Sequence, residues 1–247
     1  MIKIITTLIT LASVGASSSL NHITSFTLRS WGPIEPVKFG STNALFIDQD
    51  YTPQSVFQRA RQTDTLTICY LSVGTYEPFR KSAENIPTNV LGSYVNGWNE
   101  RWIKPDRWMD VKPHIMSRIN EAKLKGCVAI EPDNTDCYTY KNCPNRNINH
   151  AIDYINWIAE YTHSRGMLFG LKNSLEILDS VHKNVDFYIN EECLAHNECN
   201  YYDKVKGNKK IFHVEYGSIH RGACKLDNSY DSWITKYSKS TKWYNCF

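Results

Sequence analysis

The stretch GCVAIEPDN, Gly126–Asn134, indicates how the chain folds. Its small and apolar residues before Pro132 have the composition of a short strand buried on both faces, as strands inside a parallel sheet are. The strand ends in acid: Glu131 and Asp133 occupy alternate positions and so point the same way, while Pro132 ends the hydrogen-bonded ladder. Acids at the carboxyl end of such a strand are typical of α/β barrels, which keep their chemistry there.

Similar apolar segments recur along the chain and alternate with helical patterns. Helices are predicted from Pro53 to Arg61, after Pro113, from Ile148 to Arg165, from Ser174 to Val181 and from Tyr201 to Val205. Further strands are predicted at Val37–Phe39, Ala44–Asp48, Thr65–Ser72, Met167–Asn173, Val185–Glu191, Lys210–Glu215 and Trp233–Lys236. This alternation implies a parallel sheet with helices outside it.

Counting the short segments at both ends gives eight strands, which favours a closed (β/α)8 TIM-type barrel in a single domain spanning residues 31–247. An open doubly wound sheet is the alternative, but it would be expected to carry a glycine-rich phosphate loop, and the sequence has none. From Tyr76 to Asp110 prolines break any helix and tryptophans are frequent, which indicates a long, ordered, functional loop.

The first residues have the pattern of an export signal. Lys3 is followed by a short apolar run and then by small residues at Val14-Gly15-Ala16, so residues 1–16 are predicted to be a signal peptide and 17–30 an N-terminal extension. No other segment is long and apolar enough to span a membrane. The net charge of +3 includes no long basic run, so we expect a secreted or extracellular monomer that does not bind nucleic acid.

The eight cysteines are an even number in a chain expected to be exported, which favours disulfides over metal. Cys137/Cys143 and Cys193/Cys199 have the same spacing, and each pair follows a strand that ends in acid, so each is expected to close a small loop at the mouth of the barrel. Zinc sites have closer thiol spacing. Cys69 with Cys127, and Cys224 with Cys246, are possible further pairs, although the sequence alone leaves the connectivity open.

Polar side chains gather at the predicted strand ends: Asp48, Ser72, Glu131, Asp133, Lys172, Asn173, Asn190, Glu191 and Glu215. In a parallel barrel all of them meet at one mouth, where acids outnumber the single lysine and favour a neutral or cationic ligand. Two carboxyl groups are what a glycosidase needs, and nearby aromatic residues suit the flat faces of sugars. Any one of these acids can equally form a salt bridge or a helix cap; the site is indicated by their recurrence.

Five motifs in this order resemble glycoside hydrolase family 114, the endo-α-1,4-polygalactosaminidases. They are ICYLSVGTYE from Ile68, GCVAIEPDN from Gly126, GLKN from Gly170, INEEC from Ile189 and VEY from Val214, and the likeness extends from about Trp31 to the C-terminus. The resemblance implies a secreted (β/α)8 barrel that cleaves α-1,4-linked galactosamine polymers and needs no metal or cofactor.

By the same resemblance, the catalytic pair is Asp133 and Glu191, with Asp133 as nucleophile and Glu191 as general acid/base. The resemblance places substrate-binding residues at Glu131, Lys172, Asn173, Glu215 and Tyr216. Asp48, Ser72, Tyr76 and Asn134 are also predicted to bind substrate. Glu192 stands where the family more often has a neutral residue, so the choice of Glu191 rests on strand alternation, which lets only one of two neighbours face the mouth.

Two other functions stay open at this point. A non-catalytic carbohydrate-binding barrel would keep the aromatic residues but would not need both Asp133 and Glu191. A metal-dependent polysaccharide deacetylase or hydrolase would need clustered ligands, yet the histidines are scattered and no His-Glu-x-x-His motif occurs. His213 and Glu215, which share a strand face, are the best candidates for such a site.

Overall fold

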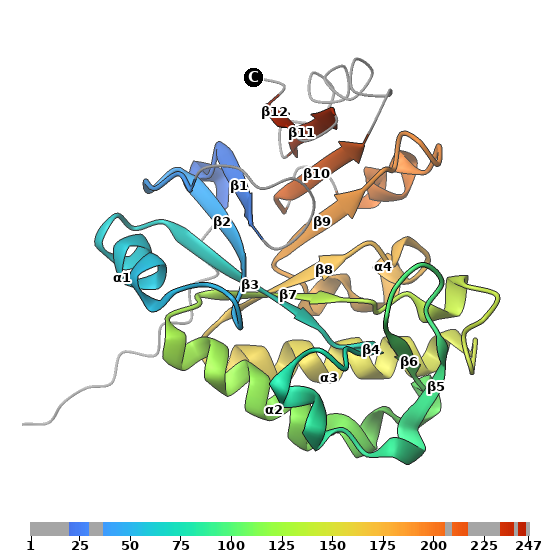
Figure 1. Ribbon diagram of the computed structural model, residues 1–247. Coiled ribbons are helices and arrows are strands. Elements are labelled where there is room, and N and C mark those ends of the chain that lie inside the picture. Colours follow the sequence, from blue (N-terminus) through green and yellow to red (C-terminus); the bar gives the residue numbers. More distant parts are fainter. Residues whose placement is uncertain (1–19, 30–36, 206–208, 217–232, 240–241, 246–247) are drawn as a thin grey trace, which may run out of the picture.

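The computed structural model describes residues 20–29, 37–205, 209–216, 233–239 and 242–245. Its main sheet follows the order β1-β2-β3-β7-β8-β9-β10-β11-β12, and all neighbouring strands are parallel except the last pair. The strands are β1 Ser25–Arg29, β2 Asn43–Asp48, β3 Leu66–Ser72, β7 Ala129–Asp133, β8 Leu168–Lys172, β9 Phe187–Glu191, β10 Ile211–Tyr216, β11 Trp233–Lys239 and β12 Lys242–Asn245. The sheet curls into a barrel, which confirms the predicted fold class (Figure 1).

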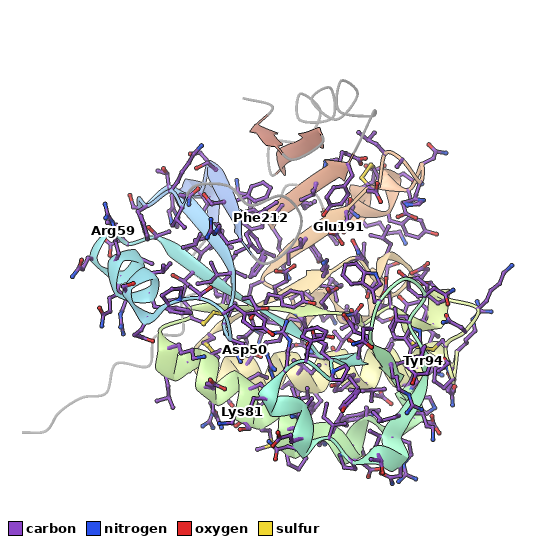
Figure 2. All side chains as sticks on the ribbon, in the orientation of Figure 1. Asp50, Arg59, Lys81, Tyr94, Glu191 and Phe212 are labelled. Carbon is purple, nitrogen blue, oxygen red and sulfur yellow. A yellow bond between two sulfur atoms is a disulfide. The ribbon has the colours of Figure 1, made fainter. Side chains whose placement is uncertain are left out.

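Phenylalanines from distant strands fill the interior of the barrel. Phe26 of β1 contacts Phe46 of β2 and Phe212 of β10 with ring centroids 5.8 and 5.5 Å apart, and Phe187 of β9 lies 5.7 Å from Phe212. All these contacts are edge-on, the arrangement that aromatic pairs prefer. In Figure 2 the labelled Phe212 lies between β10 and the first strands. These contacts hold the two ends of the curled sheet together.

The outer layer is formed by helices α1 Gln54–Gln62, α2 Trp108–Lys125, α3 Ile148–Ser164 and α4 Leu178–Val181. Helices α2 and α3 run side by side along one side of β7 and β8 (Figure 1). Ile115, Ile119 and Ile155 are fully or almost fully buried against the sheet. Helix α2 begins before Pro113, not after it as predicted, and the proline lies inside the helix.

Short 3-10 helices complete the connections. They are η1 Leu20–His22, η2 Lys81–Asn85, η3 Thr88–Val90, η4 Pro105–Arg107, η5 Cys137–Thr139, η6 Leu175–Ile177, η7 His182–Asn184 and η8 Cys199–Lys204. None of the helices in the described part of the chain is long and apolar enough to cross a membrane.

The segment that prolines set apart in the sequence forms a small sheet of its own. Strands β4 Thr75–Tyr76, β5 Leu91–Tyr94 and β6 Arg101–Ile103 pair antiparallel in the order β4-β6-β5. We call residues 75–103 the arm. Trp102 is buried where the arm packs against the Cys137–Cys143 disulfide, so the arm is fixed to the loop that follows β7.

One predicted strand is absent, and three of the predicted disulfides lie among the described residues. Val37–Phe39 is not a strand; the first strand is Ser25–Arg29, in the segment that the sequence placed before the barrel. Three predicted disulfides are present: Cys69–Cys127 joins β3 to the turn between α2 and β7, and Cys137–Cys143 and Cys193–Cys199 close their loops. Cys224 and Cys246 lie outside the described residues.

Candidate active site

The carboxyl ends of β7, β8 and β9 bring two acids and a lysine together. Lys172 Nζ lies 3.3 Å from Asp133 Oδ2 and 3.1 Å from Glu191 Oε2, so one buried cation contacts both carboxylates. Because Asp133, Lys172 and Glu191 each end a neighbouring parallel strand, strand alternation points all three into the mouth. Glu191 is labelled at the end of β9 in Figure 2.

The electrostatics of Lys172 are dominated by these acids. Burial disfavours its charged form, but the carboxylates of Asp133, Glu191 and Glu131 outweigh burial and hold the pKa of Lys172 well above its ordinary value. Glu131 Oε1 lies 3.9 Å from Lys172 Nζ, and its side chain is fully buried. Burial, with the charges of Asp133 and Glu191, raises the pKa of Glu131 well above its ordinary range, and Lys172 opposes this shift.

Hydrogen bonds fix the orientation of Glu191 from two sides. The Tyr216 hydroxyl donates to Glu191 Oε1 at 2.7 Å, and the backbone N–H of Glu191 donates to Asn173 Oδ1 at 2.9 Å. Asn173 has a φ of 48°, in the left-handed region that asparagine tolerates better than most residues. The acid is therefore held in place before any substrate binds.

The neighbour of Asp133 is held by the start of the arm. Asn134 Nδ2 donates to Ser72 Oγ at 2.9 Å and approaches Thr75 Oγ1 at 3.3 Å, and Thr75 in turn donates to Glu100 Oε2 at 2.6 Å. This chain of polar contacts joins β3, the residue after β7 and the arm. The position of Asp133 is thereby coupled to the arm.

A buried arginine anchors the other side of the arm. Arg80 contacts Asp48 Oδ2 and Asp50 Oδ2, each at 2.7 Å, and Glu77 Oε2 at 2.5 Å. Arg118 of α2 also contacts Asp50, at 3.0 Å. Five charged groups, from β2 and the turn after it, the arm and α2, are thus joined beside the mouth. The ion pairs satisfy charges that would otherwise be costly to bury.

These groups surround a cavity of about 800 Å³ that the arm and the barrel mouth enclose between them. Its lining consists of acids, aromatic rings and amides: Tyr70, Glu77, Phe79, Arg80, Val95, Asn96, Trp98, Asn99, Glu100, Trp102, Asp133, Asn134, Asp136, Tyr140, Asn173, Glu191 and Tyr216. Aromatic faces and carboxylates in one cavity fit a ligand with flat apolar faces and polar or positively charged groups.

The family comparison matches the chain to the Glycoside-hydrolase family GH114 over residues 21–246. The chain belongs to family GH114. Its structure resembles that of Aspergillus fumigatus Ega3, solved in complex with galactosamine, with a TM-score of 0.77 and 26% identity over 90% of this chain and 99% of that one. A comparison with curated protein sequences finds no match.

The same fold occurs in more distant glycoside hydrolases. The glycoside hydrolase domain of PelA from Pseudomonas aeruginosa superposes with a TM-score of 0.64 at 12% identity, covering 91% of this chain and 95% of that one. A GH18 chitinase from Pseudoalteromonas aurantia gives 0.52 at 7% identity, covering 87% and 94%. At these identities the likeness concerns the fold alone.

The structure brings together part of the site that the sequence predicted for this GH114 glycoside hydrolase. The cavity is lined by Asp133, Asn134, Asn173, Glu191 and Tyr216. Lys172 lies against the two acids, whereas Glu131 lies behind it and Ser72 binds Thr75, both buried. Asp48 binds Arg80, and Tyr76 packs against the outer core, so neither lines the cavity.

Glu215 is on the opposite face of β10 from the mouth. Val214 pairs with Glu191 in the sheet register and Tyr216 reaches Glu191, so the residue between them points outward. There Glu215 Oε1 accepts hydrogen bonds from the Leu194 backbone N–H and faces His213 Nε2, both at 2.8 Å. The structure therefore places Glu215, which was predicted to bind substrate, away from the residues that line the cavity. Alternation, applied as it was to Glu191 and Glu192, gives this answer.

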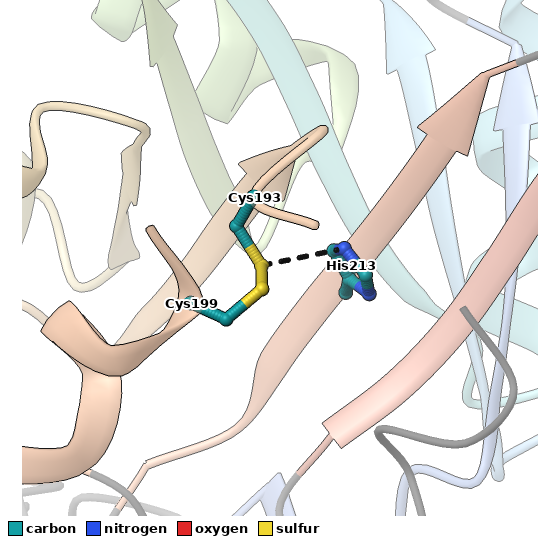
Figure 3. A group of neighbouring side chains, drawn as sticks. All are labelled: Cys193, Cys199 and His213. Atoms are coloured by element: carbon teal, nitrogen blue, oxygen red, sulfur yellow. Dashed lines mark hydrogen bonds between the residues drawn. A yellow bond between two sulfur atoms is a disulfide. The ribbon is translucent and has the colours of Figure 1, made fainter. Parts of the chain in front are cut away.

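His213 also belongs to the group of described residues that most resembles a metal site. His213 Nε2 lies 3.6 Å from Cys193 Sγ, and a ligand atom of each of Cys193, Cys199 and His213 is within 4.8 Å of the others. Both sulfurs are joined in a disulfide, as Figure 3 shows, and neither is a thiolate that can bind metal. His213 and Glu215 are fully buried outside the barrel, away from the cavity.

Three acids of the cavity were not identified as site residues from the sequence. Asp136 follows the EPDN motif, and Glu77 and Glu100 belong to the arm. Burial and the charge of Asp133 raise the pKa of Glu100, although its hydrogen bond from Thr75 opposes the shift. Asp136 could have been found from its place between Asp133 and the cysteine-closed loop. Glu100 could not, because the sequence does not show how the arm folds back.

Proposed function

We propose that this GH114 enzyme is an exported endo-acting hydrolase of α-1,4-linked galactosamine polymers that uses Asp133 and Glu191. The observation that carries the proposal is the convergence of these two acids on Lys172 at the wall of a large aromatic and acidic cavity. Further support comes from the likeness to Ega3, which was solved with galactosamine. The acids in the cavity suit a polymer that carries free ammonium groups.

The reaction follows from the placement of the two carboxyl groups. Asp133 attacks the anomeric carbon while Glu191 gives its proton to the departing glycosidic oxygen, so the C–O bond breaks as the bond to Asp133 forms. Glu191 then takes a proton from water, whose oxygen displaces Asp133 from the anomeric carbon. Lys172 stabilises the carboxylate of Asp133 before attack and after release, and Tyr216 orients Glu191.

The spacing of the two acids favours retention of configuration. Both contact the same Nζ atom, at 3.3 and 3.1 Å, so these two oxygens cannot be farther apart than the two contacts placed end to end. Carboxyl groups that share one ammonium group in this way resemble those of retaining enzymes, about 5–5.5 Å apart, more than those of inverting enzymes, which lie roughly 6.5–9.5 Å apart and leave room for water. We therefore expect the first product to keep the anomeric configuration of the bond that was cleaved, which proton NMR of the fresh product would show.

The test of the proposal uses two isosteric substitutions and one matched control. Asp133→Asn and Glu191→Gln are each expected to lower the rate of polymer cleavage at least about a hundredfold while polymer binding is retained. Glu192→Gln makes the same chemical change at the next residue, whose side chain faces His196 instead of the cavity, and should keep full activity. Full cleavage by both catalytic variants would refute the assignment.

Export is supported by the predicted signal peptide and by three disulfides, which persist in oxidising compartments. Expression of the full chain in a eukaryotic secretory host should release protein that begins after residue 16 into the medium. N-terminal sequencing of the released protein checks this. Retention of the unprocessed chain in the cells would contradict export.

A further inference from the structure

Asp136 occupies a defined place beside the catalytic pair. It lies three residues after Asp133, at the start of the loop closed by the Cys137–Cys143 disulfide, and it lines the same cavity as Asp133 and Glu191. Its backbone oxygen accepts a hydrogen bond from Thr139 at 2.9 Å, which holds the turn. In the described part of the chain no side chain donates a hydrogen bond to the carboxylate of Asp136.

The surroundings of Asp136 are unfavourable for an isolated carboxylate. Burial and the charges of Asp133 and Glu191 raise the pKa of Asp136 to about 7, against the opposing effects of its own backbone and of Lys172. A cation placed beside Asp136 would relieve this repulsion. Glu100, the other acid in this part of the cavity, already accepts a hydrogen bond from Thr75 at 2.6 Å and is less available to a ligand.

An aromatic ring stands next to this acid. Tyr140 lines the same cavity as Asp136, four residues further along the chain. The charge of Asp136, together with burial, raises the pKa of Tyr140 to about 12. Tyr140 is 46% exposed and packs against the buried Trp102 of the arm, with ring centroids 5.1 Å apart. Trp102 therefore supports a Tyr140 ring that remains open to solvent and to the cavity.

We propose that Asp136 and Tyr140 form a subsite for one amino sugar of the polymer, distinct from the residues that perform the cleavage. The apolar face of the sugar ring rests on Tyr140, and the ammonium group at its second carbon contacts the carboxylate of Asp136. An N-acetylated sugar lacks this positive charge and gains nothing from Asp136. The subsite thus makes the enzyme prefer deacetylated stretches, an inference that rests on the proposed function.

The experiment compares Asp136→Asn with the wild type on two soluble substrates, α-1,4-galactosamine oligomers and the same oligomers after N-acetylation. Asn keeps the shape of the side chain and removes its charge. We expect KM for the deacetylated oligomers to rise about tenfold, as for loss of one charge-assisted hydrogen bond, with kcat changed little. KM for the acetylated oligomers should stay within about twofold, so the preference between the two falls.

Two further variants make the result specific. Asp153→Asn removes an exposed acid of α3, away from the cavity, and should change neither KM. Tyr140→Ala should raise KM for both oligomers because the ring contacts the sugar face that they share. Thermal unfolding of each variant shows that it is folded.

The outcomes separate this inference from the proposed function. If the wild type cleaves galactosamine oligomers and Asp136→Asn changes KM equally for both substrates, or for neither, the subsite is refuted and the proposed function stands. If the wild type cleaves neither oligomer, the proposed function itself fails. Loss of kcat without a change in KM would place Asp136 in the chemistry of cleavage and would also overturn the subsite.

Discussion

Lys172 is the residue on which the arrangement of the two acids depends. Without a cation between them, Asp133 and Glu191 would repel each other across the mouth, and the buried Glu131 would lose the positive charge 3.9 Å from its carboxyl group. The ion pairs are therefore part of the active geometry, and their loss should affect activity more than surface ion pairs would.

Replacing Lys172 tests this role directly. Lys172→Met keeps the length of the side chain and removes the charge, and we expect kcat to fall by roughly 10²–10³, as for loss of one preorganised electrostatic contact. Lys183→Met, at an exposed position of η7, is the matched control and should leave kcat unchanged. Steady-state kinetics on galactosamine oligomers measures both. An active Lys172→Met enzyme would mean that the acids hold their positions without the cation.

Asp136 should also affect how stability depends on pH. Folding raises its pKa from an ordinary value of 3.8 to about 7, so the folded state binds this proton more tightly than the unfolded state. The contribution to stability is present at low pH and is lost as pH rises from about 4 to 7. Over that range the free energy of unfolding of the wild type should fall, relative to that of Asp136→Asn, by at most about 1.4 kcal/mol per pH unit. The fall should be smaller than this limit because Asp136 is partly exposed.

Urea unfolding of both proteins at several pH values between 4 and 7 measures this difference. The free energies of unfolding should diverge in favour of Asp136→Asn as pH rises. Parallel curves would show that Asp136 has the same proton affinity in the folded and unfolded states.

At the scale of the elements, the approach of the arm to β7 depends on one glycine. A Cβ atom on Gly74 would lie 1.7 Å from the backbone oxygen of Asn134, a distance that requires backbone movement. The backbone N–H groups of Val73 and Gly74 both donate to the Asp133 oxygen, at 3.1 and 3.3 Å. Movement here therefore shifts the end of β7, which carries Asp133.

Gly74→Ala is expected to destabilise the protein by about 3 kcal/mol or more and to lower activity, because the clash involves backbone on both sides. Gly97→Ala is the matched control: its φ of 81° strains an alanine, but no atom lies within 4 Å, so the cost should be only about 1 kcal/mol. Thermal unfolding and a cleavage assay on both variants measure the difference. Equal losses in the two variants would contradict the steric argument.

The elements also show which structures the sequence could predict. Strands such as Ala129–Asp133 and Phe187–Glu191 are short apolar runs ended by acid, a local pattern, and helix α3 has strong apolar periodicity. Val37–Phe39 resembled a strand in composition, but Ser25–Arg29 pairs with β2 in its place. That choice depends on tertiary contacts such as Phe26 with Phe212, which sequence patterns do not contain.

The candidate site, like the fold, was predictable where a local pattern places the side chain and not where tertiary contacts do. Strand alternation predicted that Glu191 faces the mouth, and Glu191 lines the cavity. Alternation was not applied to Glu215, which lies on the other face of its strand. Residues placed by the arm, such as Glu100, depend on how a proline-rich segment folds back over the mouth. Antiparallel pairing of β5 with β6 decides this, and neither strand is distinct in the sequence.

For the whole molecule, overall charge and local charge have opposite signs. The chain carries a net charge of +3, yet acids predominate in the cavity, so a cationic polymer is attracted only close to the site. Charges separated by more than the Debye length, about 8 Å at physiological salt, are largely screened. Attraction of the polymer is therefore set by the cavity acids and not by the net charge.

This arrangement predicts a salt effect confined to charged substrates. Raising ionic strength from about 0.05 to 0.5 M should increase KM for deacetylated galactosamine oligomers several-fold, because salt screens the contact between ammonium groups and cavity acids. For N-acetylated oligomers KM should stay nearly constant. The kcat should change little for either substrate, because the buried Lys172 contacts Asp133 at 3.3 Å and Glu191 at 3.1 Å, and salt screens such close, buried pairs poorly. An equal rise in KM for both substrates would show that salt acts on the enzyme as a whole, and the cavity acids would then not be what holds the polymer.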